Sequence, residues 1–200
     1  MVRPFEETFW FTAIRVIVIH GSGGLGKTRL LLSLPEIVPE GRSLWYVRNT
    51  AESIEPDLVS LDLEHQHIIV VDDAHRFNLL PQLREVLVNP EFASKVTLIL
   101  ATRSVFKDSI LYQLGTLLDN QLAAIEVQPL SNQDINQILE SSPYNIAKED
   151  VRYAIVKTTE GNPLFAGIAA RLVQQGRTLA NLSREQILTN YLDEIIKDLA

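Results

Sequence analysis

The sequence of 200 residues contains no cysteine. This absence excludes a disulfide framework, a thiol nucleophile and a cysteine-based zinc or iron–sulfur site. The sequence also lacks a basic excess, since 18 lysine and arginine residues stand against 25 acidic residues for a formal net charge of -7. Nucleic acids and anionic membranes attract proteins mainly through basic residues, so this charge argues against a general affinity for either.

The sequence has no apolar run of the length that a membrane span needs. The strongest candidate, residues 9–19, is short and is interrupted by Arg15. It leads directly into a glycine-rich segment, as a buried strand does, so we interpret it as the end of a helix followed by a strand and not as a targeting signal. A cytoplasmic location is therefore expected.

The composition that is present, with 46% hydrophobic and 22% charged residues, is typical of a folded globular protein. Two helical patterns, at residues 27–34 and 79–88, lie between short apolar runs. Apolar strands that alternate with helices favour an α/β fold, in which helices cover both faces of a parallel sheet. Five runs rich in branched residues predict the strands: 15–20, 43–47, 67–71, 96–101 and 123–127.

The character of the sequence changes after Pro129, where helical periodicity continues without further strands. Ser131 and Asp134 have the spacing of a helix N-terminal cap, which places a helix start just after the fifth strand. We therefore predict an α/β core over residues 1–130 and a helical subdomain over residues 131–200. The predicted helices cover 132–141, 148–159, 163–175 and 184–199.

A phosphate-binding pattern lies between the first predicted strand and the first predicted helix. The segment Gly21-Ser22-Gly23-Gly24-Leu25-Gly26-Lys27-Thr28 matches G-x-x-x-x-G-K-[ST] at every fixed position. In such a loop the backbone N–H groups surround phosphate oxygens, the lysine bridges the β- and γ-phosphates and the hydroxyl binds magnesium. We assign this loop and the next residue, Arg29, to nucleotide binding. The alternative is a glycine-rich turn with a surface lysine.

Two acids follow the third predicted strand. Asp72 is the candidate to hold the magnesium shell, and Asp73, one residue further, could act as general base toward the attacking water. The alternative is that both aspartates only cap the next helix. His75 follows closely, but a lone histidine after a strand is more often a turn residue than a catalyst, and we leave its role open.

Together these motifs resemble the STAND NTPases, the branch of the AAA+ superfamily that includes the NB-ARC and NACHT switch proteins. The resemblance covers nearly the whole chain. Asp73-Ala74-His75 is similar to a D-x-H variant in some bacterial members, and Thr102-Arg103 is similar to the threonine-arginine sensor of the family. Gly161-Asn162-Pro163-Leu164 is similar to the glycine-x-proline motif of its helical lid.

The resemblance implies an AAA+ core followed by a helical lid, with the start of a winged-helix domain from about residue 183. It implies that Arg103 reads the γ-phosphate and that Pro163 packs near the adenine. The expected ligands are ATP or ADP with Mg²⁺, and the expected activity is slow ATP hydrolysis that drives a conformational switch. The expected partners are further copies of the chain or other modules of a longer protein, without direct contact to nucleic acid or membrane.

Two other functions stay open from the sequence alone. One is a metabolic small-molecule kinase, although residues 129–200 contain few arginines for a closing lid. The other is a structural nucleotide-binding module without turnover, which the intact Lys27, Thr28, Asp72 and Asp73 do not exclude. A GTPase is disfavoured because no asparagine-lysine-x-aspartate segment occurs, and no ABC-transporter signature is present.

Overall fold

The computed structural model describes residues 14–48, 53–115, 121–177, 183, 185–190 and 192. It divides into two compact units. The sheet unit comprises the described residues of Met1–Ser22 and Lys27–Val127, and the helical unit comprises those of Gly23–Gly26 and Gln128–Ala200. The expected helix end before residue 14 lies outside the described residues, as does most of the predicted helix 184–199 that would begin a winged-helix domain.

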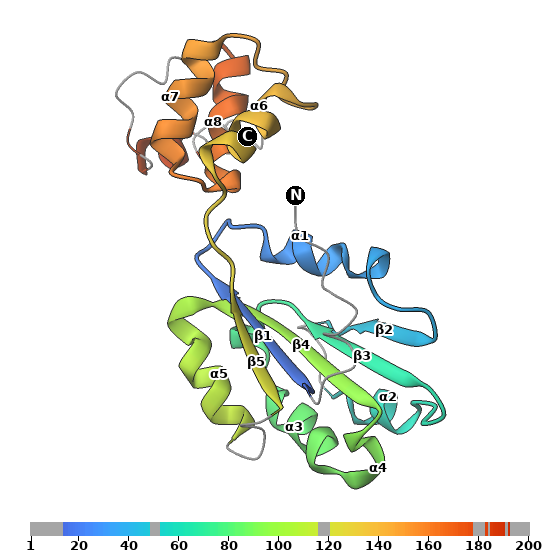
Figure 1. The fold of residues 1–200 in the computed structure, drawn as a ribbon. Helices are drawn as coiled ribbons and strands as arrows, with labels where there is room; N and C mark the ends of the chain where they lie inside the picture. The colour runs from blue at the N-terminus through green and yellow to red at the C-terminus, as the bar shows by residue number, and fades with distance from the viewer. Residues whose placement is uncertain are drawn as a thin grey trace, which may run out of the picture. The chain divides into compact units, whose positions relative to one another are not determined.

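The sheet unit is built on five parallel strands, in the order β2-β3-β4-β1-β5 (Figure 1). Each strand end lies within about two residues of its predicted position. The predicted α/β class, with helices around a parallel sheet, is confirmed. The strands are β1 (Val16–Gly21), β2 (Arg42–Tyr46), β3 (Gln66–Val71), β4 (Val96–Arg103) and β5 (Leu122–Glu126).

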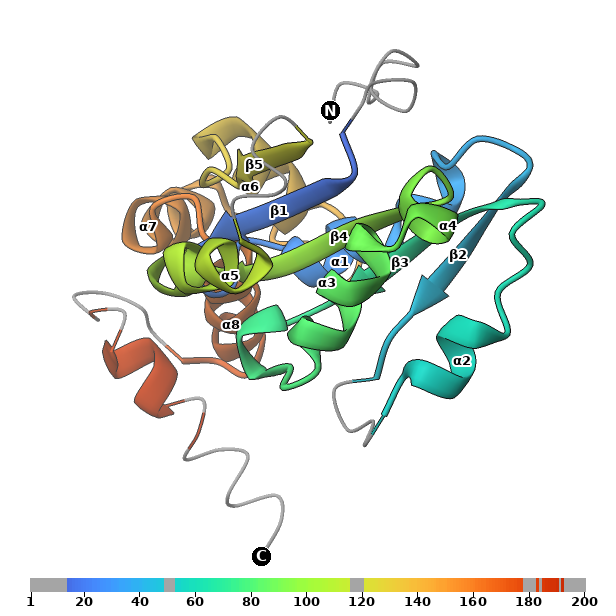
Figure 2. The same ribbon diagram turned by 90° about the horizontal axis from the view of Figure 1, so that it is seen from below.

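Both faces of the central strands are buried, which explains their continuous apolar runs. Because successive side chains of a strand point to opposite faces, Val16 and Val18 enter one hydrophobic cluster while Ile17 and Ile19 enter another. Helices α2 (Glu55–Val59), α3 (Leu80–Val88) and α5 (Lys107–Leu114) contribute to the first cluster. Helix α1 (Lys27–Leu32) and the 3-10 turn η2 (Leu34–Glu36) contribute to the second, so the helices lie on opposite faces of the sheet (Figures 1 and 2).

The short helix α4 (Pro90–Ala93) was not expected from the sequence. The helix predicted over residues 79–88 is confirmed to within one residue as α3, but the next helix begins at once. Asn89 ends α3 and also caps α4, because its side chain accepts a hydrogen bond from the Glu91 N–H. Two further 3-10 turns, η3 (Ala74–Arg76) and η4 (Ser104–Phe106), follow β3 and β4.

The helical unit contains α6 (Asn132–Glu140), α7 (Glu149–Thr159) and α8 (Pro163–Gln174) around its own apolar core. The cap predicted at Ser131 is confirmed: its hydroxyl accepts from the Asp134 N–H, and the Asp134 carboxylate accepts from the Ser131 N–H. No helix in the described ranges is long and apolar enough to cross a membrane.

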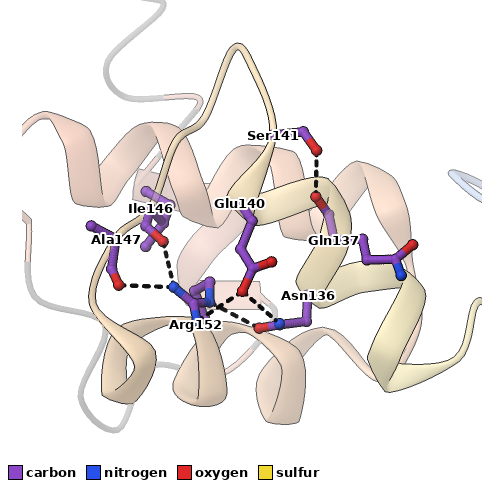
Figure 3. A network of polar contacts seen from close by, with 7 residues as sticks. All are labelled: Asn136, Gln137, Glu140, Ser141, Ile146, Ala147 and Arg152. Atoms are coloured by element: carbon purple, nitrogen blue, oxygen red, sulfur yellow. Dashed lines mark hydrogen bonds and ion pairs between the residues drawn. The ribbon is translucent and has the colours of Figure 1, made fainter.

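Arg152 joins α7 to α6 and to the segment between them (Figure 3). Its guanidinium donates to the Asn136 side chain at 3.0 Å and to the Ile146 carbonyl at 2.8 Å, and pairs with Glu140 at 2.9 Å. A planar guanidinium can make several such bonds at once, so this one side chain ties together three segments of the helical unit.

Candidate phosphate-binding site

The glycine-rich loop connects the end of β1 to the start of α1. Gly24 and Gly26 have positive φ values of 81° and 92°, a conformation that glycine adopts without steric cost. Leu25, between them, is buried. Lys27 and Thr28 then open α1, and Arg29 follows with an exposed side chain. The assignment of Arg29 to nucleotide binding stays a prediction.

The Lys27 side chain folds back over the loop. Its ammonium donates to the carbonyls of Gly21 at 2.9 Å and Ser22 at 2.8 Å, and the residue is only 8% exposed. An ammonium has three donors, so one remains for a phosphate oxygen. Burial lowers the pKa of Lys27 from its ordinary value, while the carboxylates of Asp73 and Asp72 oppose this shift. The loop lysine and both predicted acids therefore lie within electrostatic reach of one another.

Thr28 and Asp72 are in direct contact. The Thr28 hydroxyl donates to Asp72 Oδ2 at 2.6 Å, and Asp72 Oδ1 accepts from the Asp73 N–H at 2.9 Å. A hydroxyl and a carboxylate are the oxygen ligands that Mg²⁺ prefers, so the donor set fits this ion. The described residues contain no group of three or more histidine, aspartate or glutamate side chains that could hold a metal alone. A magnesium ion held here would take its other ligands from phosphate and water.

Asp73 has an unusual backbone conformation. Its φ of 48° and ψ of 44° lie in the left-handed region, which costs free energy for most residues with a side chain but is tolerated by aspartate and asparagine. It occupies the cap position of η3, yet its side chain makes no capping hydrogen bond. The alternative that this carboxylate serves only as a helix cap is therefore not supported. Strained residues of this kind concentrate at functional sites.

Arg103 lies at the carboxyl end of β4, directly beside the start of the loop. The register pairs Gly21 with Arg103, and β3 lies on the other side of β4. The charge of Arg103 adds to the lowering of the pKa of Lys27. In the sheet unit, Lys27, Thr28, Asp72, Asp73 and Arg103 thus meet at the carboxyl ends of neighbouring parallel strands.

Two histidines also lie at these strand ends, and sequence analysis assigned neither a role. His75 stacks on Phe106 with ring centroids 4.5 Å apart and 7° between the ring planes. Burial lowers the pKa of His75, an effect that the Asp73 carboxylate opposes and the charge of Arg103 reinforces. His20, the penultimate residue of β1, lies with Nδ1 3.3 Å from Ser104 Oγ. The signal that could have drawn attention to them is their position beside the loop and the acids.

The helical unit contains a further contact that sequence analysis missed. Asn162 is 8% exposed, and its Nδ2 donates to the carbonyl of Gly23 at 2.9 Å, while its Oδ1 accepts from the first N–H groups of α8. The Leu164 N–H donates to the Gly24 carbonyl, with 3.3 Å between the nitrogen and the oxygen. Pro163 begins α8 between these two contacts, as helix-start chemistry favours. Its assignment to the adenine stays a prediction.

Solved structures with a similar fold include three that span most of this chain. RuvB from Thermotoga maritima, a Holliday junction branch migration motor, has a TM-score of 0.54 at 17% identity over 90% of this chain. Domain III of the replication initiation protein DnaA from the same organism has a TM-score of 0.56 at 19% identity over 92%. Cdc6p from Pyrobaculum aerophilum has a TM-score of 0.55 at 16% identity over 81%.

All three are AAA+ P-loop ATPases. The chain has their fold. The match spans 62% of the RuvB chain, 85% of DnaA domain III and 56% of Cdc6p. No protein-family model and no curated protein matches the sequence. The fold shared with these three proteins gives the phosphate loop and the acids their expected setting, because ligands of open parallel sheets bind at the carboxyl ends of the strands.

Proposed function

We propose that this chain binds ATP with Mg²⁺ and hydrolyses it slowly, as the nucleotide switch module of a STAND-type signalling ATPase. The observation that carries the proposal is the 2.6 Å contact between Thr28 Oγ1 and Asp72 Oδ2 in an AAA+ fold. It joins the phosphate loop to the strand that ends in two acids, which is the pairing that a magnesium–phosphate site requires.

Binding of the triphosphate falls to the loop and Lys27. The loop N–H groups and the Lys27 ammonium would neutralise the β- and γ-phosphates, and the ammonium is already directed along the loop by its two carbonyl acceptors. Thr28 and Asp72 would hold Mg²⁺, which supplies further neutralisation of phosphate charge.

Hydrolysis falls to Asp73 and Arg103. A water oxygen attacks the γ-phosphorus, the bond from that phosphorus to the bridging oxygen breaks, and ADP and phosphate leave. The Asp73 carboxylate accepts the proton of the attacking water, and the Arg103 guanidinium donates hydrogen bonds to γ-phosphate oxygens as their charge redistributes. The Asp73 side chain makes no capping hydrogen bond, which leaves its carboxylate available for this role.

Switching requires that ATP and ADP differ in their interactions with the protein. The γ-phosphate is the only difference between the two ligands, and Arg103 is the residue proposed to read it. The doubled acid, Thr102-Arg103 and the segment 161–164 support the STAND assignment through their resemblance to that family. Self-association, or contact with other modules of a longer chain, is the proposed route by which the switch acts.

The names of the structural neighbours suggest another candidate, a motor or initiator that acts on DNA. The net charge of -7 disfavours direct DNA binding by this segment, because phosphate contacts need a basic surface. A small-molecule kinase and a non-hydrolysing binding module remain as alternatives.

Phosphate release from ATP and Mg²⁺ by the purified chain separates these functions. We expect slow release without an added acceptor or DNA, loss of release in Lys27→Ala, and unchanged release in the control Lys148→Ala, which alters an exposed lysine at the start of α7. Binding without release would indicate a structural module, and release only with an added small-molecule acceptor would indicate a kinase. Strong stimulation by DNA would favour the DNA-directed alternative.

A further inference from the structure

Two histidines, one from β1 and one from the turn η3 after β3, contact residues 102–106, which comprise the last two residues of β4 and the turn η4. His20 of β1 lies 3.3 Å from Ser104, through Nδ1 and Oγ. His75, which follows β3, lies 3.4 Å from Thr102, through Nδ1 and Oγ1, and its ring stacks on Phe106. Because β4 lies between β3 and β1 in the sheet, the segment is held from both sides.

Arg103 lies between the two contacted hydroxyl residues. Its backbone is extended, with φ of -81° and ψ of 147°, so the residues on either side point away from its own side chain. Thr102 is fully buried, whereas Arg103 is exposed. The two histidines therefore hold the backbone around Arg103 and leave its guanidinium free to extend from the sheet.

Arg103 needs such support from its neighbours. In the part of the chain that the structure describes, no ion pair holds its guanidinium. An arginine side chain loses considerable conformational freedom when it is fixed on a ligand. The backbone direction from which the side chain starts therefore decides how often the guanidinium reaches that ligand. The contacts of His20 and His75 fix that starting direction.

We propose that His20 and His75 are positioning residues that hold residues 102–106 so that Arg103 meets the γ-phosphate, and that they thereby set the preference for ATP over ADP. This inference rests on the proposed nucleotide binding. Each hydroxyl can donate to or accept from imidazole Nδ1, so the contacts form with either neutral tautomer. Neither histidine touches the nucleotide in this arrangement, and both act through Arg103.

The test is competition binding of ADP and a non-hydrolysable ATP analogue to the full 200-residue chain. His75→Phe keeps the ring on Phe106 but removes Nδ1, and His20→Ala removes the other contact. Each should weaken the analogue by about threefold to tenfold, as expected for one lost hydrogen bond, with ADP affinity unchanged. His20→Asn places a polar atom at the position of Nδ1 and should restore most of the preference.

Two comparisons separate positioning from a general structural role. Arg103→Ala should weaken the analogue by about tenfold to a hundredfold, and in that background the histidine substitutions should cause no further loss. The control is His65→Ala, which alters an exposed histidine that contacts Asp62 just before β3, at the opposite ends of the strands. This variant should bind both nucleotides as the wild type does.

The inference is overturned if the histidine substitutions weaken ADP and the analogue equally, or if their effects add to that of Arg103→Ala. It also fails, while the proposed function stands, under a second outcome. In that outcome Lys27→Ala abolishes nucleotide binding and Arg103→Ala narrows the preference for the ATP analogue over ADP, but the histidine variants keep that preference. If Lys27→Ala binds both nucleotides normally, the proposed function itself is wrong, and this inference falls with it. Thermal melts of each variant identify any that has failed to fold. If His20→Ala fails, competition binding to His20→Asn still tests the contact of residue 20.

Discussion

The Thr28 hydroxyl donates to the Asp72 carboxylate at 2.6 Å and so links the first turn of α1 to the residue that follows β3. The two residues are 44 positions apart in the sequence, and the parallel sheet brings them together. Under the proposed function both side chains belong to one magnesium shell, and single substitutions separate their predicted roles from those of the other site residues.

Thr28→Val keeps the shape of the side chain and removes its hydroxyl. We expect ATP affinity in the presence of Mg²⁺ to fall by about tenfold or more, because one metal ligand is lost, while affinity in excess chelator stays as in the wild type. Titration calorimetry under both conditions measures the difference. Thr158→Val, which removes a hydroxyl bonded to the Ala154 carbonyl in α7, is the matched control. Equal losses of ATP affinity with and without Mg²⁺ would show that Thr28 does not bind the metal ion.

Asp73→Asn should separate hydrolysis from binding. Asparagine tolerates the left-handed backbone at this position, so the local structure should survive, while the group that accepts the proton is lost. The turnover rate per bound ATP should fall by about a hundredfold or more, with ATP affinity within about twofold of the wild type. Single-turnover phosphate release and titration together provide both values. A collapse of binding with unchanged turnover per bound ATP would reverse the assignments of Asp72 and Asp73.

Gly24 and Gly23 form a matched pair for testing the loop. A Cβ at Gly24 would lie 2.7 Å from Asn162 Oδ1, and the φ of 81° is unfavourable for alanine, whereas a Cβ at Gly23 meets nothing within 4 Å. Gly24→Ala should lower the free energy of unfolding by about 1–3 kcal/mol, and Gly23→Ala should change it by less than about 0.5 kcal/mol. Urea denaturation of both variants without nucleotide tests this. Equal effects of the two substitutions would contradict both the positive φ of Gly24 and the close approach of Asn162 to it.

The stability of the chain should depend on pH through His75. Burial holds the pKa of His75 in the folded state below its ordinary value of 6.5, so the unfolded chain binds the proton more readily. Stability from this group is therefore present above about pH 6.5 and is lost as the pH falls through that value toward the folded-state pKa. His75→Phe and His75→Asn should each lose less stability than the wild type between pH 7.5 and 5.5 in urea denaturation. Equal losses of stability in the wild type and in these variants would contradict a lowered pKa of His75 in the folded state.

Much of the fold could be predicted from the sequence because its signals are local. Strands buried on both faces read as continuous apolar runs, and the cap at Ser131 is fixed by a residue three positions away. The order of the strands could not be predicted, since β1 pairs with β4 and β5, which come much later in the chain. Helix α2, with five residues, is too short to show a helical period.

The candidate site divides in the same way. The loop and the two acids were found because phosphate chemistry demands particular residues at fixed spacings. The role of Asn162 could not be predicted, because its partner, the Gly23 carbonyl, is 139 residues away and backbone acceptors leave no trace in a sequence. The contact of His75 with Thr102 could not be predicted either, because it depends on η3 lying against β4.

Titration of ATP and Mg²⁺ into the wild type and Lys27→Ala tests whether the loop binds the nucleotide. The ammonium of Lys27 is held by two loop carbonyls, and the Lys27 side chain belongs to none of the three hydrophobic clusters. The variant should therefore fold. We expect saturable binding to the wild type and a loss of about a hundredfold or more in Lys27→Ala, because a charged donor to phosphate is removed. Wild-type affinity in a folded Lys27→Ala chain would contradict nucleotide binding through the loop.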